Sequence, residues 1–305
     1  MKRLLLLVIF AAFPLYASAG QDFRLTLSAT GVAYTTADIA SAPSVCIEPY
    51  KAPHNHLTTF DGTSWVSVDV PKATYCLSAS GLTPNAIYDV LGSISGGIPI
   101  LSWSAAYTND TTPPARAWQD GMEVLAADHT KLVIGTVKVN GIGTLSDSHS
   151  CRCLSNYYRP EPRDMWAQDP ALTWNNWTTT QYRDATAYQQ AHGNSANQLE
   201  YVAVVPRLIG AHVQAAVINL SGGGDFVGIG LDGNSLGDVS QYRMQASIPS
   251  SLGSVSFQTS ADYFGTPGLG RHTVLWLEHI YLGSATWLGS IPPSQISGIY
   301  GMVMN

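Results

Sequence analysis

Charged side chains are scarce in this sequence: 15 Lys and Arg with 21 Asp and Glu make up only 12% of its 305 residues. Disordered chains carry more charge and fewer aromatic residues than the 10% found here. The net charge of −6 also disfavours nucleic acid as a partner, because nucleic-acid binding needs a concentrated basic surface. We therefore expect a folded protein with a polar, weakly charged surface and no nucleic-acid partner.

Long hydrophobic runs are missing beyond residue 20, which excludes a bundle of membrane-spanning helices. The N-terminus has a basic start, a short apolar run at Leu4–Ala12, and the small residues Ala17, Ala19 and Gly20. This order is typical of a secretory signal peptide, and the alternative is an anchor that stays attached. We predict that residues 1–19 are cleaved, that the mature chain begins at Gly20 or Gln21, and that it is secreted or periplasmic with no stable membrane span. Cleavage would remove Lys2 and Arg3 and leave 13 basic against 21 acidic residues, a net charge of −8.

Cysteine is rare, and the four cysteines suit an oxidising compartment. Cys46 and Cys76 lie in two strand-like segments joined by an apparent hairpin, so we predict a disulfide between them. Cys151 and Cys153 are two residues apart and, on an extended strand, should diverge too far for easy closure. A metal site at this Cys-x-Cys pair is disfavoured, because zinc sites usually need a second pair of ligands.

Helical periodicity is almost absent, and the best short helix candidate is Ala115–Ala127. Period-two alternation instead predicts strands at Ser64–Val70, at Ala211–Leu220 and at Ser254–Ala261. The apolar run Thr273–Leu277, like Tyr201–Val205, predicts an interior strand of a packed sandwich. Asp-Gly and Asn-Gly turn signals separate these segments. The predicted fold class is therefore all-β.

A Pro- and Trp-rich stretch without sustained periodicity lies near the middle of the chain. We predict a linker over residues 156–180 that lies on a surface. It would join an N-terminal β-sandwich-like domain at 20–155 to a C-terminal jelly-roll or β-sandwich domain at 181–305.

The familiar catalytic motifs are absent: no nucleophile elbow, no His-Glu-x-x-His and no phosphate-binding loop. Gly228–Gly233 fits the dinucleotide fingerprint by letter, but turn residues follow it where a helix is required, so we interpret it as a strand end. We predict no cofactor, no metal site and no set of catalytic residues, although carboxylates distant in sequence could still form a glycosidase pair.

Three groups of polar residues have simpler interpretations than catalysis or metal binding. His54 and His56 lack a third ligand and are interpreted as loop residues. Glu278, beside His279 in an apolar strand, is interpreted as a buried structural carboxylate. The last group consists of turn-forming aspartates without the spacing of a calcium loop: Asp225, Asp232 and Asp238.

Short blocks in fixed order from about residue 25 to the C-terminus carry a resemblance to known proteins. They are Tyr107–Thr112, Gln119–Gly121, Gly135–Thr136, Asn156–Arg159, Ala196–Glu200, Val227–Asp232, Gly268–His272, Trp276–Glu278 and Thr286–Ile299. The sequence resembles a family of phage-encoded virion proteins, described as tail-fibre proteins or as virion proteins of unknown role. The resemblance implies a β-rich virion component with a sandwich or jelly roll at its C-terminal end, and it brings no catalytic residues. The signal peptide and the cysteines depart from the pattern and point to an exported relative.

These observations favour a non-enzymatic structural or adhesion protein, akin to a phage receptor-binding fibre. Exposed Trp and Tyr stack on sugar faces, so a cell-surface glycan is the expected partner. The first alternative is a secreted carbohydrate-active hydrolase with two carboxylates across a groove. The second is a purely structural subunit that binds other copies of itself, for example as a homotrimer, through an uncovered apolar face.

Overall fold

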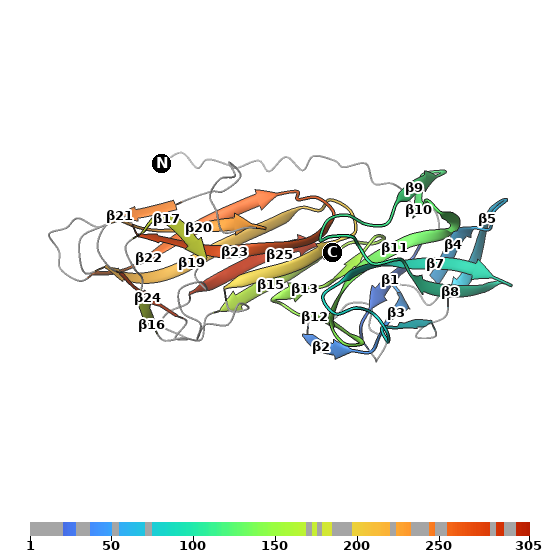
Figure 1. The fold of residues 1–305 in the computed structure, drawn as a ribbon, viewed down its shortest axis with the longest axis horizontal. Helices are drawn as coiled ribbons and strands as arrows, with labels where there is room; N and C mark the ends of the chain where they lie inside the picture. The colour runs from blue at the N-terminus through green and yellow to red at the C-terminus, as the bar shows by residue number, and fades with distance from the viewer. Residues whose placement is uncertain are drawn as a thin grey trace, which may run out of the picture.

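The computed structural model is built from β-strands throughout its described part (Figure 1). It describes residues 21–28, 37–50, 55–70, 75–168, 173–175, 179–184, 197–219, 224–232, 244–247, 255–280, 285–289 and 297–305. The all-β prediction is confirmed, because these residues form sheets that are antiparallel except at one pair of strands, and they form no helix. Within them there is likewise no helix long and apolar enough to cross a membrane. The predicted signal peptide, with Ala17, Ala19 and Gly20, lies outside the described residues.

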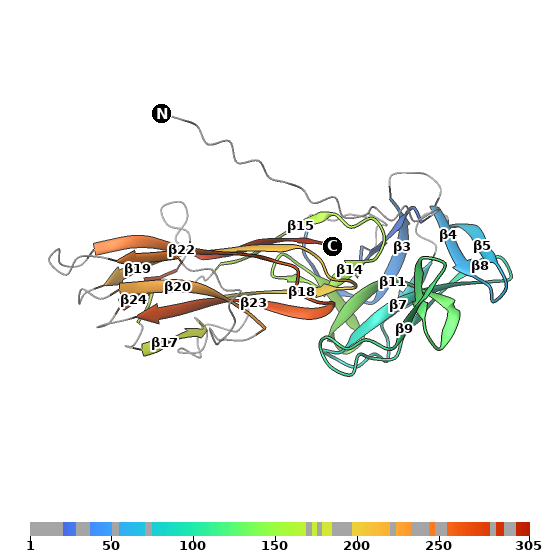
Figure 2. The same cartoon turned by 90° about the horizontal axis from the view of Figure 1, so that it is seen from above.

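One end of the molecule is a sandwich of two six-stranded sheets (Figures 1 and 2). The first sheet contains β13 (Cys151–Arg152), β17 (Thr179–Asp184), β18 (Gln198–Ala203), β20 (Gly224–Leu231), β21 (Met244–Ser247) and β23 (Gly270–Ile280). The second contains β15 (Pro162–Gln168), β16 (Thr173–Asn175), β19 (Ile209–Asn219), β22 (Val255–Gly265), β24 (Ala285–Leu288) and β25 (Gly298–Met304).

The sandwich core lies between the inner faces of these two sheets. In β19 the residues Ala211, Val213, Ala215 and Val217 are buried, as the alternation predicts. Trp276 and Trp287 are fully buried in the same core. Replacing either indole by alanine would cost about 3–5 kcal/mol, so this layer holds the two sheets together.

The other end is built around an eight-stranded sheet. It contains β2 (Ile39–Ala42), β7 (Ile87–Ser95), β8 (Ile98–Trp103), β9 (Arg116–Gln119), β10 (Met122–Leu125), β11 (Asp128–Gly141), β12 (Thr144–Asp147) and β14 (Leu154–Asn156). A three-stranded sheet and a hairpin pack beside it: β1 (Phe23–Thr26), β3 (Ser44–Pro49) and β6 (Cys76–Ser78), with β4 (Asn55–Phe60) and β5 (Trp65–Val70). Their shared apolar core is separate from that of the sandwich.

The helix expected at Ala115–Ala127 is wrong, because the segment forms the hairpin of β9 and β10. Asp120 and Gly121 form its turn with φ of 49° and 85°, the left-handed backbone that two-residue hairpin loops need. The Asp-Gly pair therefore decides the local structure, and the apolar residues around it alternate as in a strand.

Part of the segment expected as a linker, residues 156–180, is instead the strand β15 of the sandwich. β15 pairs with β25 along its whole length, from Pro162 opposite Met304 to Gln168 opposite Gly298. Pro162 fits here because it is the first residue of an edge strand, where no ladder hydrogen bond is lost. The chain thus passes from β13 in one sandwich sheet, through β14 in the eight-stranded sheet, to β15 in the other sandwich sheet.

Direct contacts join the two ends of the molecule. The Arg116 guanidinium of β9 donates to the Val204 carbonyl at 2.7 Å, and the Val204 amide donates to Ser155 Oγ at 3.1 Å. Leu91 and Val133 pack with Val204 in a small apolar cluster at the same place. The sandwich and the eight-stranded sheet therefore share a packed junction.

Candidate functional site

A line of aromatic rings crosses the outer face of the second sandwich sheet. Trp166 of β15 lies opposite Tyr300 of β25, Tyr300 lies opposite His212 of β19, and His212 lies opposite Asp262 of β22. Residues directly opposite each other on neighbouring strands project from the same face. That face is the outer one, because Trp166 is 43% exposed while Met165 and Ala167 on either side are buried in the core.

A fourth ring extends the line beyond the edge strand. The Trp166 amide donates to the His149 carbonyl at 3.0 Å, so the 149 loop runs beside β15. The His149 and Trp166 rings have centroids 5.3 Å apart and an interplanar angle of 36°. We call His149, Trp166, Tyr300 and His212 the ring row.

A carboxylate holds the imidazole at each end of the ring row. His149 Nδ1 lies 2.6 Å from Asp38 Oδ1, and His212 Nδ1 lies 2.8 Å from Asp262 Oδ1. The Asp38 and Asp262 side chains are 52% and 54% exposed, so each keeps oxygen surface for other partners. The row therefore presents flat apolar faces between two exposed hydrogen-bond acceptors.

Glycines let two rings on the outer face of this sheet lie close to its backbone. A Cβ at Gly298 would come within 3.2 Å of the Tyr300 hydroxyl, which accepts a hydrogen bond from Gln168 Nε2 at 3.0 Å. A Cβ at Gly210 would come within 2.9 Å of the Phe264 ring. Phe264 is 68% exposed, so its ring adds a second apolar surface next to the row.

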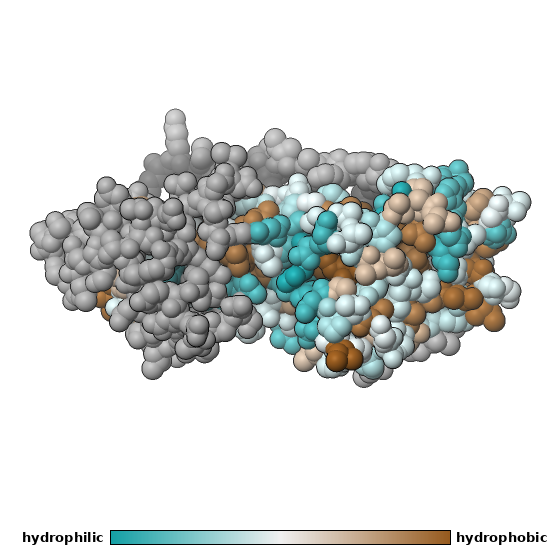
Figure 3. Space-filling view, in the orientation of Figure 1, coloured by the Kyte–Doolittle hydropathy of each residue, from teal (hydrophilic) through white to brown (hydrophobic). Residues whose placement is uncertain are grey.

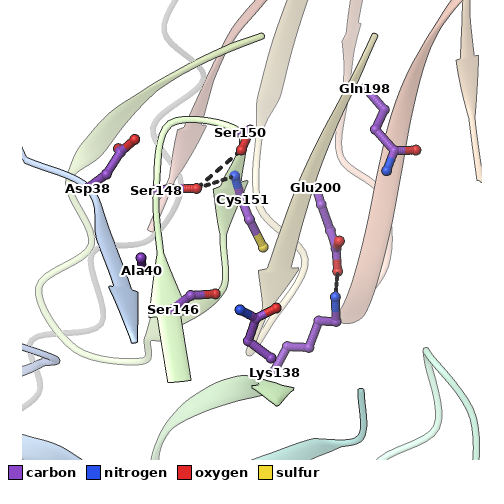
Figure 4. Close-up of a pocket in the computed structure, with 10 residues that line it drawn as sticks. Asp38, Ala40, Lys138, Ser146, Ser148, Ser150, Cys151, Gln198 and Glu200 are labelled. Atoms are coloured by element: carbon purple, nitrogen blue, oxygen red, sulfur yellow. Dashed lines mark hydrogen bonds and ion pairs between the residues drawn. The ribbon is translucent and has the colours of Figure 1, made fainter. Parts of the chain in front are cut away.

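A polar pocket of about 340 Å³ lies at the junction, beyond the His149 end of the ring row (Figure 4). The eight-stranded sheet and the first sandwich sheet both contribute to its lining. The residues that line it are Asp38, Ala40, Lys138, Asn140, Ser146, Ser148, Ser150, Cys151, Gln198 and Glu200. Eight of the ten lining residues have polar side chains, and Ala40 and Cys151 are the two apolar contributors.

One carboxylate of the pocket is already engaged by cations. Lys138 Nζ and Arg271 Nε each lie 2.6 Å from Glu200 Oε1 (Figure 4 shows the lysine contact). Both cations bind the same oxygen, so Glu200 joins Lys138 of the eight-stranded sheet to Arg271 of the sandwich.

Both cysteine pairs are disulfides in the structure. Cys46 and Cys76, the pair that the sequence favours, lie opposite each other on β3 and β6 with Cα atoms 4.0 Å apart. Cys151 and Cys153 are also joined, contrary to the expected divergence. Their Cα atoms are 5.3 Å apart, closer than the roughly 6.6 Å of two extended residues, because β13 ends at Arg152 and the backbone bends there.

The disulfide at Cys151 and Cys153 lies beside Glu200. Ligand atoms of the three residues lie within 4.8 Å of one another, which is close enough for a shared metal ion. The two sulfurs are bonded to each other, however, and a metal ligand must be a free thiolate. The group is therefore part of the pocket wall in this state.

A buried cluster of carboxylates lies away from the pocket. Asp89 is fully buried and accepts hydrogen bonds from Tyr107, Thr136 and Arg116 at 2.7–3.1 Å. Arg116 also contacts Glu123 at 3.3 Å, and burial raises the pKa of Glu123 above its ordinary value. Because these carboxylates share one guanidinium inside the junction, the cluster holds the fold together.

The remaining segments and residues singled out in the sequence lie elsewhere, as far as the structure describes them. Gly228–Leu231 is the end of strand β20, as interpreted. Glu278 is buried in β23, and Arg271 of the same strand contacts Glu200 and Asp110. His56 pairs with Asp69 on the surface, whereas His54 and Asp238 lie outside the described residues.

Asp232 turns out to be the partner of a histidine that the sequence did not single out. Its carboxylate lies 2.7 Å from His272 Nδ1. Burial would lower the pKa of His272, but the hydrogen bond and charge of Asp232 outweigh it and raise that pKa above 6.5. The pair joins the end of β20 to β23.

The surface of the described part is a mosaic of hydrophilic and hydrophobic residues on the face shown in Figure 3. The exposed large apolar side chains include two tryptophans, Trp118 on β9 and Trp166 in the ring row. Trp118 lies on the hairpin at the other end of the molecule, so its substitution can serve as a control for substitution of Trp166.

Comparisons with known proteins give no family. No protein-family model and no curated protein matches this chain. Among solved structures, the insecticidal δ-endotoxin Cry8Ea1 of Bacillus thuringiensis is similar with a TM-score of 0.26 and 9% identity, over 94% of this chain and 52% of the toxin. The mosquito-larvicidal Cry4Aa toxin of Bacillus thuringiensis is similar with a TM-score of 0.26 and 8% identity, over 87% of this chain and 49% of the toxin. The chain thus spans about half the length of both toxins.

A viral structure is similar to this chain with a comparably low TM-score. The infectious bursal disease virus Gx strain is similar with a TM-score of 0.25 and 9% identity, over 93% of this chain and 72% of the viral chain. Scores this low carry no argument about function.

Proposed function

We propose that the chain is a non-enzymatic adhesion protein that binds a glycan through the ring row. The observation that carries the proposal is the register of Trp166, Tyr300 and His212, which places one exposed and two half-buried rings side by side on one sheet. Indole and phenol rings have apolar faces and a polar edge, so they stack on the C–H faces of sugars while their edges stay hydrated. A rigid sheet holds the rings in place before binding, which lowers the entropic cost of association.

Carboxylates at the ends of the row supply the second half of glycan recognition. Sugar hydroxyls donate hydrogen bonds, and exposed Asp38 and Asp262 offer acceptors next to the terminal imidazoles. A weakly acidic protein with few charges suits such a neutral, hydroxyl-rich ligand better than a polyanion.

The predicted signal peptide and the resemblance to phage virion proteins support the same proposal. Both place the protein where it meets cell surfaces, either secreted or periplasmic, or displayed on a virion as a tail-fibre-like component. Receptor binding by such a component needs a rigid β scaffold with an exposed contact face, which the sandwich provides.

The experiment is glycan-array binding of the mature protein beside three variants. Trp166→Ala and Tyr300→Ala should each lose about 2 kcal/mol, roughly thirtyfold in affinity, as central aromatic contacts do. Trp118→Ala removes a more exposed indole from the other end of the molecule and should bind like the wild type. Equal binding by all four proteins would refute the ring row as the site.

Two alternatives predict other outcomes of the same experiment. Release of sugar fragments from the array would identify a carbohydrate-active hydrolase. A concentration-independent trimer in light scattering, without glycan binding, would identify a structural subunit that uses Phe264 and its neighbours as a contact between copies.

A further inference from the structure

The polar pocket offers both donors and acceptors to a ligand. Lys138, Asn140 and Gln198 supply N–H donors, and the Asn140 and Gln198 amides also supply carbonyl oxygens. Within the described part of the chain, these two amides form no hydrogen bond to protein. Ser148 and Ser150 contribute hydroxyls 3.2 Å apart. A sugar hydroxyl both donates and accepts, so a wall of mixed amides, hydroxyls and carboxylates matches it.

Charge narrows the class of ligand. Asp38 and Glu200 contribute two negative charges to the lining and Lys138 contributes one positive charge, a sum of −1. The single cation is bound to Glu200 at 2.6 Å, and Arg271 is directed at the same carboxylate. An anionic sugar would therefore meet Asp38 with no uncompensated cation to receive it.

Asp38 makes the pocket continuous with the ring row. The residue lines the pocket, and its carboxylate accepts from the His149 backbone amide at 2.8 Å. The His149 ring in turn contacts Trp166. A ligand that enters the pocket can therefore continue over His149 onto the flat surface of Trp166 and Tyr300.

We propose that this pocket receives the terminal residue of the bound glycan, and that this residue is a neutral or amino sugar. The inference rests on the proposed function, with the ring row holding the following residues of the chain. The pocket determines which glycan is recognised, and the row contributes affinity to any glycan long enough to reach it.

The test combines competition by free monosaccharides with a pocket variant. Asn140→Ala with Gln198→Ala removes two amides that have no partner in the described part, so the fold should persist, as circular dichroism would verify. Gln119→Ala removes an amide from β9, far from the pocket, and serves as the matched control. Each protein is titrated with a panel of oligosaccharides that end in neutral, N-acetylated, amino or acidic sugars.

The wild type should prefer glycans with one neutral or amino terminal sugar, and the free monosaccharide should compete. The pocket variant should bind those glycans about tenfold more weakly and lose the preference, whereas Gln119→Ala should not differ from the wild type. Trp166→Ala should weaken all bound glycans and keep the preference.

Two results overturn the inference while the proposed function stands. One is a pocket variant whose affinities and preference match those of the wild type, and the other is a wild-type preference for acidic terminal sugars. Absence of any glycan binding by the wild type overturns the proposed function and this inference together.

Discussion

Substitution of Asp89 by Asn tests whether the buried ionic cluster holds the two ends of the molecule together. Asp89 is fully buried and the Arg116 side chain is 5% exposed. The guanidinium contacts Asp89 through both Nε and Nη2, and its Nη1 reaches the Val204 carbonyl beyond the junction. An amide at position 89 keeps the shape but removes the charge and directs an NH₂ group or a neutral oxygen toward Arg116.

The expected cost is large because the buried guanidinium would lose its main counterion and keep only the 3.3 Å contact with Glu123. Breaking one partner of a buried ion pair costs about 3–5 kcal/mol, most of it from the remaining charge. At roughly 2–4 °C per kcal/mol for a chain of this size, Asp89→Asn should lower Tm by about 10 °C. Removing one neutral donor with Thr136→Val should cost only about 1 kcal/mol.

Urea unfolding followed by tryptophan fluorescence measures these differences as shifts of the midpoint. The control is Asp69→Asn, because the His56–Asp69 pair is 50% and 62% exposed. Surface pairs contribute little, so this variant should stay within about 0.5 kcal/mol of the wild type. A loss for Asp89→Asn no larger than that of Asp69→Asn would refute the role of the cluster.

Three further predictions concern stability. Replacing Cys46 and Cys76 by Ala opens a bridge between residues 30 apart and should cost about 3–4 kcal/mol in urea unfolding. Because burial raises the pKa of Glu123, the folded state retains a proton there that the unfolded state loses above about pH 4.5. The contribution of Glu123 to the free energy of unfolding is thus greatest below that pH and falls as pH rises. Glu123→Gln should therefore make the free energy of unfolding depend less on pH, and an unchanged pH dependence would contradict this prediction. The pKa of His272 is raised by Asp232, so the stability it contributes is present below pH 6.5 and lost as pH rises through the higher folded pKa. His272→Gln should therefore cost more at pH 6 than at pH 9 in thermal unfolding, and a pH-independent cost would exclude the pairing.

The sandwich could be predicted from the sequence wherever a strand has one buried face. In β19 the alternation of Ala211, Val213, Ala215 and Val217 with polar neighbours is visible in the sequence, and the structure buries those four residues. The helix expected at Ala115–Ala127 was wrong although its Asp-Gly turn is also visible, because the turn outweighs helix propensity when a hairpin can form.

The ring row was harder to predict because its members come from three strands and a loop. Trp166 lies in a Pro-rich segment that is predicted to be a linker. Only the apolar neighbours Met165 and Ala167, which the structure buries, indicate a strand. The register that places Tyr300 and His212 next to it is set by pairing across the sheet, which no local pattern contains. The pocket is harder still, since Asp38, Lys138 and Glu200 meet only through packing of the two ends.

The central claim is tested most directly by titrating the mature wild-type protein, Trp166→Ala and Trp118→Ala with an oligosaccharide selected from the glycan array. If the ring row is the binding surface, Trp166→Ala binds roughly thirtyfold more weakly while Trp118→Ala keeps the wild-type Kd. Equal Kd values for Trp166→Ala and the wild type, with both proteins folded, would contradict the account.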